Sequence, residues 1–75
     1  MKDYERDRLI YLTKTAVEIN ERLLSEENQF IKAVTDENET SILEEMIEDI
    51  NILCTQEHLY LAAAKSLVER INKEK

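Results

Sequence analysis

The sequence predicts an all-α protein in which two long helices fold back on each other as an antiparallel hairpin. The 75 residues include no glycine and no proline; tight β-turns depend on these residues, whereas helices are weakened by both. Apolar residues recur at alternating three- and four-residue steps, which is the period of an amphipathic helix. The longest interruption of this pattern is a polar stretch near the middle of the chain that includes residues 35–40.

We expect one domain over residues 1–75, with a first helix at about 3–34, a turn at 35–40 and a second helix at about 41–72. Ser41 and Glu44 have the spacing of a capping box, which predicts the start of the second helix. The polar stretch at 25–28 also contains helix-capping residues. A break there would give a three-helix bundle, which is the alternative fold.

Composition excludes several classes of function. The formal net charge of −7 disfavours nucleic acid as a partner, because binding to phosphates requires a basic surface. No apolar run is long enough to cross a membrane, and the first residues lack the apolar segment of a signal peptide. Cys54 is the only cysteine, so no internal disulfide can form and a cytoplasmic location is expected. The acidic stretch at 36–57 has two interpretations. Its negative charges either interact favourably with the dipole at the start of the second helix or form a patch that binds a basic partner.

The apolar pattern is wider than one neighbouring helix can cover. On the first helix the main coiled-coil-like seam consists of Leu9, Leu12, Ala16, Ile19, Leu23, Phe30 and Val34. On the second helix the main face consists of Leu43, Met46, Ile47, Ile50, Leu53, Cys54, Leu61, Ala64, Leu67, Val68 and Ile71. Folding near residue 38 pairs these two sets, with Leu23 opposite Leu53.

Further apolar residues lie outside the two main sets. The first helix has a second row spaced by seven residues, and the second helix has a thin strip nearly opposite its main face. Exposed apolar area of this size marks an interaction surface. We therefore expect a homodimer that forms a four-helix bundle, or a complex with a helical partner. The residues expected to bind the partner are Ile10, Val17, Leu24, Ile31, Ile52 and Leu59.

No residue constellation predicts catalysis, a metal site or a cofactor site. Cys54 and His58 are one helical turn apart and Glu57 is adjacent, but zinc requires at least three protein ligands. We expect Cys54 to be a small core residue and His58 to lie at the boundary of the core. Without glycine the chain has no loop that could cradle a phosphate. The protein is therefore expected to be non-enzymatic, with no small-molecule substrate.

Two short segments resemble known families. The acidic run at 44–49 resembles the acidic helix of nucleotide pyrophosphatases of the MazG type, which implies Mg²⁺-dependent hydrolysis. That family carries Glu-Glu-x-x-Glu on an earlier helix, whereas residues 26–30 end in Phe30. Its second motif also has an aspartate three residues after a glutamate, whereas Asp49 follows Glu45 by four.

The alanine-rich run at 59–71 is similar to the second helix of type III secretion needle co-chaperones. This resemblance implies an obligate complex with a helical-repeat chaperone. Small inhibitors and immunity proteins share the same composition and represent the same class of hetero-complex.

Overall fold

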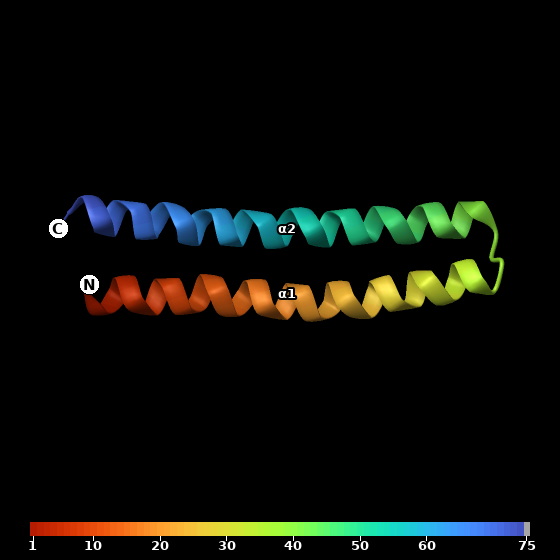
Figure 1. Ribbon diagram of the computed structural model, residues 1–75, viewed down its shortest axis with the longest axis horizontal. Helices are drawn as coiled ribbons and strands as arrows, with labels where there is room; N and C mark the ends of the chain where they lie inside the picture. The colour runs from red at the N-terminus through yellow and green to blue at the C-terminus, as the bar shows by residue number, and fades with distance from the viewer. Residues whose placement is uncertain (75) are drawn as a thin grey trace.

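The computed structural model describes residues 1–74 and consists of two antiparallel helices, α1 (Asp3–Thr35) and α2 (Thr40–Lys73) (Figure 1). The molecule is a rod of 56 × 15 × 13 Å. The predicted all-α hairpin is confirmed. Because α1 continues without interruption through residues 25–28, the three-helix alternative is wrong. Neither helix, within the described residues, is both long and apolar enough to cross a membrane.

The two helices begin in different ways. At the start of α1, the Glu5 carboxylate accepts a hydrogen bond of 2.8 Å from the backbone N–H of Lys2, which satisfies one of the unpaired donors of the first turn. At the start of α2, Glu39 is the capping residue and its side chain makes no capping bond. The predicted capping box at Ser41 is wrong, because Thr40 is already helical and Ser41 therefore lies inside the first turn.

The turn between the helices is a Schellman motif built without glycine. The backbone N–H of Asn38 donates to the carbonyl of Ala33 at 3.1 Å, and the N–H of Glu37 donates to the carbonyl of Val34 at 3.0 Å. This pattern places Glu37 at the position after the helix cap, which adopts the left-handed conformation and is usually glycine. Glu37 has φ = 55°. Its β-carbon therefore adds steric strain to the turn.

Replacing this residue is expected to stabilise the hairpin. Glu37→Gly removes the β-carbon from a left-handed position, so we expect a gain of about 0.5–1 kcal/mol and a rise in Tm of about 2–8 °C, measured by thermal circular dichroism at fixed concentration. Glu37→Ala is the matched control because it removes the charge but keeps the β-carbon. If the alanine variant gains as much as the glycine variant, repulsion among the acidic residues is the cause rather than backbone strain.

The helices pack along a seam whose members recur every three or four residues. The buried apolar residues are Leu12, Ala16, Leu23 and Ala33 on α1 and Ile50, Leu53, Leu67 and Ile71 on α2. Half-buried residues and the buried Glu5 fill the remaining steps of the pattern. The complete seam is Glu5, Leu9, Leu12, Ala16, Ile19, Leu23, Glu26, Phe30 and Ala33 on α1, and Leu43, Met46, Ile50, Leu53, Glu57, Tyr60, Ala64, Leu67 and Ile71 on α2.

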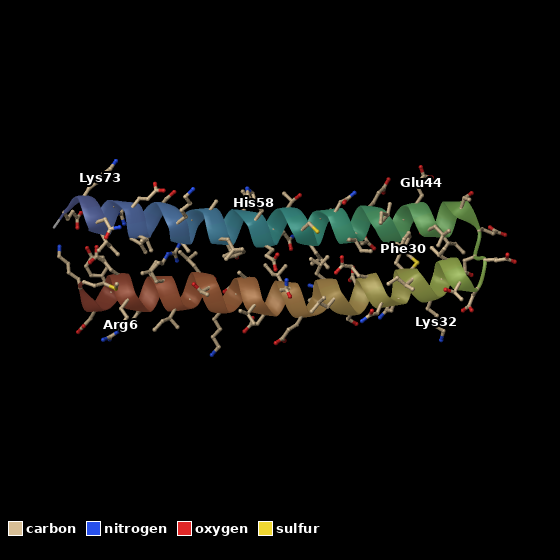
Figure 2. The ribbon with its side chains drawn as sticks, viewed as in Figure 1. Arg6, Phe30, Lys32, Glu44, His58 and Lys73 are labelled. Atoms are coloured by element: carbon tan, nitrogen blue, oxygen red, sulfur yellow. The ribbon has the colours of Figure 1, made fainter. Side chains whose placement is uncertain are left out.

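The best-packed part of the seam is a cluster of Leu23, Ile50 and Leu53, which Ile19 and Phe30 extend on either side. Figure 2 shows Phe30 directed into the space between the helices. The cluster confirms the expected pairing of Leu23 with Leu53. Among residues 1–74, however, no side chain falls below 2% exposure. The hairpin therefore has a seam between two helices rather than a closed core.

Candidate interaction surface

The seven-spaced row on α1 remains uncovered in the hairpin. Ile10, Val17, Leu24 and Ile31 are each between 51% and 62% exposed. Each of them directly follows a seam residue, so it is rotated about 100° around the helix from that residue and away from α2. The structure thus places these four predicted partner-binding residues in solvent, in line along the helix.

A matching row runs along α2, and sequence reasoning assigned it to the wrong environment. Ile47, Cys54, Leu61 and Val68 are exposed, although all four were expected on the main buried face. Each directly follows a seam residue, in the same way as the α1 row. The expectation fails because a helix with a single neighbour buries only a narrow stripe, and residues one step beside that stripe stay in water.

The same reason accounts for a smaller error on α1. Val34 was expected in the seam, but Ala33 is buried there and Val34 is 48% exposed. Val34 directly follows Ala33, so it lies on the same flank of α1 as the seven-spaced row.

Both rows lie on the same side of the hairpin. Residues that immediately precede and follow a seam position point to opposite flanks of a helix. Arg22 and Ile52, which precede Leu23 and Leu53, line one cleft on a single side of the hairpin. Near the termini, Arg8 and Ser66 line a second cleft and also precede seam residues. The residues that follow seam positions must therefore share the other side.

We call this second side the apolar face. Its apolar members are Ile10, Val17, Leu24, Ile31 and Val34 from α1 and Ile47, Cys54, Leu61 and Val68 from α2. Polar residues that also follow seam positions, among them Thr13, Asn20, Asn51 and His58, share this side. Sequence reasoning missed the α2 contribution, although its seven-residue spacing, equal to that of the α1 row, was visible in the sequence.

Ile52 and Leu59, the other two predicted partner-binding residues, are 55% and 62% exposed. They precede the seam residues Leu53 and Tyr60, so the structure does not bring them together with the α1 row. They lie on the opposite side, where Arg8 and Arg22 line the clefts. The six predicted residues are therefore split into four on the apolar face and two on its reverse.

The ion pairs of the described chain are all local to α1. Arg6 lies 3.6 Å from both Asp3 and Asp7, and Arg22 lies 3.9 Å from Glu26. No ion pair within residues 1–74 connects the two helices. The seam and the turn hold the hairpin together, and exposed pairs within one helix add little to its stability.

The chemistry-bearing residues do not converge. Cys54 is a free, exposed thiol, so the expectation that it packs in the core is wrong. His58 is also exposed, and Figure 2 shows it pointing away from α1. Among the described residues no three His, Cys, Asp or Glu side chains are grouped to hold a metal ion. Of the acids in the MazG-like segments, Glu26 and Asp49 line one cleft, together with Gln29 and Met46.

The fold and this surface define an amphipathic helical hairpin with one uncovered apolar face. Comparisons of the chain with protein-family models, with curated proteins and with solved structures found no match.

Proposed function

We propose that the protein is a non-enzymatic helical interaction module whose apolar face binds a second helical surface, in the first place another copy of the same chain. The observation that carries this proposal is the apolar face itself, a double row of exposed apolar side chains. Two such hairpins placed face to face would form a four-helix bundle, in which each helix contacts two neighbours.

The size of the face supports a stable association. The rod is 56 Å long, and two helices of about 10 Å diameter give the side that bears the apolar face an area on the order of 1,000 Å². Stable protein–protein interfaces bury about 800 Å² on each partner. This side of the hairpin, with the apolar face at its centre, is thus large enough for a specific complex without any rearrangement of the hairpin.

The small seam is a second argument for association. A chain of 75 residues has little interior, and single cores in this size range supply only about 3–5 kcal/mol. Covering the apolar face would remove further aliphatic area from water at about 25 cal/mol per Å². Association would therefore stabilise the fold while it performs the function.

The test is the molar mass in solution, measured by light scattering across a range of concentrations. We expect a dimer of the 8.9 kDa chain at micromolar concentration, with a Tm that rises with concentration because association stabilises the folded state. A monomer that is fully helical and unfolds cooperatively at all concentrations would contradict the proposal. A poorly folded monomer would assign the face to a helical hetero-partner, as in a secretion-type co-chaperone complex.

A further inference from the structure

The charges of the chain are distributed unevenly along the rod. Residues 20–56, which form the half of the hairpin nearest the turn, carry ten acidic and two basic side chains. The remaining residues carry seven acidic and eight basic side chains. The two basic residues of the turn-proximal half, Arg22 and Lys32, directly precede the seam residues Leu23 and Ala33. They therefore lie on the side away from the apolar face.

The borders of the apolar face show the same imbalance. Glu21, Glu27 and Glu44 adjoin the face in its turn-proximal half, one helical turn from Leu24, Ile31 and Ile47 respectively. Near the termini, Arg6 and Asp7 adjoin the face one helical turn before Ile10 and pair with each other. Two further cations adjoin the face there. Lys14 lines a shallow apolar hollow with Ile10 and Val17, and Lys65 follows the seam residue Ala64. Apart from Arg6 and Asp7, none of these charges takes part in an ion pair within residues 1–74.

On the basis of the self-association proposed above, we infer that the occupant of the apolar face is a second copy in reversed orientation. The turn of one copy lies over the termini of the other, so that α1 packs antiparallel to α1 and α2 packs antiparallel to α2. This arrangement has twofold symmetry about an axis perpendicular to the rod. A second copy also matches the face in length and presents two apolar rows to two apolar rows.

Apolar contact alone does not determine the orientation. The rows of α1 and α2 extend along the same length of the rod, from Ile10 and Val68 near the termini to Ile31 and Ile47 near the turn. Two copies that point in the same direction could therefore also bury the face.

The charges distinguish the two orientations. Copies that point in the same direction place the acidic borders of both faces at one end, where like charges less than about 10 Å apart repel. Copies that point in the same direction also place Lys14 of one copy and Lys65 of the other at nearly the same level along the rod axis, where the two positive charges repel. The reversed orientation instead places both lysines over the acidic half of the other copy. Electrostatic complementarity of this kind sets the register and direction of an interface.

The distance between two spin labels decides between these orientations. The label is attached at Thr35→Cys, at the turn end of α1, in a Cys54→Ser background whose dimeric mass is verified first. In the reversed orientation the labels lie at opposite ends of the bundle, so we expect a separation of about 50 Å by pulsed dipolar spectroscopy. A dimer with labels within about 20 Å of each other would overturn the reversed orientation and leave self-association intact. A monomeric mass of the unsubstituted chain would overturn both proposals.

A charge substitution gives a second test of the orientation. Lys14→Glu places like charges opposite each other at two symmetry-related positions of the reversed dimer, so we expect a Kd about tenfold weaker by sedimentation equilibrium. In the other orientation the same substitution relieves repulsion from Lys65 and strengthens association. A Kd that is unchanged or lower would overturn the reversed arrangement. Lys32→Glu, on the side away from the face, is the matched control and is expected to leave the Kd within about twofold.

Discussion

Val17→Glu is expected to convert the dimer into a monomer at concentrations at which the unmodified chain is fully associated. Val17 is 51% exposed in the hairpin and lies in the middle of the α1 row, so the substitution leaves the seam untouched. In the dimer it places two carboxylates, one from each copy, in an apolar interface, which costs several kcal/mol if they find no partner. We expect the Kd to rise at least about 100-fold, measured by light scattering or sedimentation equilibrium.

The control for this variant lies on the reverse of the hairpin. Leu59 is 62% exposed and is also aliphatic, but it precedes a seam residue, so Leu59→Glu is expected to leave the mass unchanged. If Val17→Glu leaves the dimer intact while Leu59→Glu dissociates it, the interface lies on the side of Ile52 and Leu59. Circular dichroism of both variants checks that the helices persist.

The second large effect is expected in the seam. Leu23→Ala removes the side chain at the centre of the best-packed cluster, where it contacts Ile50 and Leu53. Truncating a buried leucine costs about 2–5 kcal/mol. We expect a loss of about 2–3 kcal/mol in the free energy of unfolding, because Leu23 is enclosed by only two helices and not by a closed core. This corresponds to a decrease in Tm of about 10–20 °C. The measurement is thermal unfolding monitored by circular dichroism.

Leu24→Ala is the matched comparison, one position along the chain. Leu24 is 55% exposed, so in samples dilute enough to be monomeric its truncation is expected to change Tm by only a few degrees. At concentrations at which the chain is dimeric, the same variant should be destabilised in proportion to the association that it loses. Equal losses for both variants in dilute samples would contradict the assignment of Leu23 to the seam and Leu24 to the apolar face.

The helices themselves could be predicted from sequence because long amphipathic patterns are strong local signals. The predicted bounds differ from α1 (Asp3–Thr35) and α2 (Thr40–Lys73) by a single residue at three of their four ends. The turn could be located but not described. Glu37 adopts a left-handed conformation that its side chain disfavours, and no local preference of glutamate indicates this. The packing of both helices against one another determines it instead.

The width of the buried face could not be predicted from periodicity alone. A repeat of apolar residues shows which side of a helix avoids water, but it does not show how many neighbours cover that side. Ile47 and Leu61 fit the three- and four-residue spacing of the apolar pattern as well as buried Ile50 does. The hairpin nevertheless leaves both of them exposed. The placement of Ile52 and Val17 on opposite sides depends on which residues form the buried seam, because Ile52 precedes Leu53 and Val17 follows Ala16. It could be predicted only once the buried stripe was narrowed to these seam residues.

In this hairpin the sequence separation between contacting residues increases with their distance from the turn, and this affects the order in which the contacts form. Residues that meet near the turn are close in sequence, whereas Glu5 and Ile71, which line one cleft at the open end, are separated by nearly the whole chain. The entropy lost on closing a loop grows with its length, so contacts beside the turn form at the lowest cost. We therefore expect the rod to close progressively from the Glu37 turn through Leu23 and Leu53. We expect its open end to assemble last and to be the first to separate in native-state fluctuations.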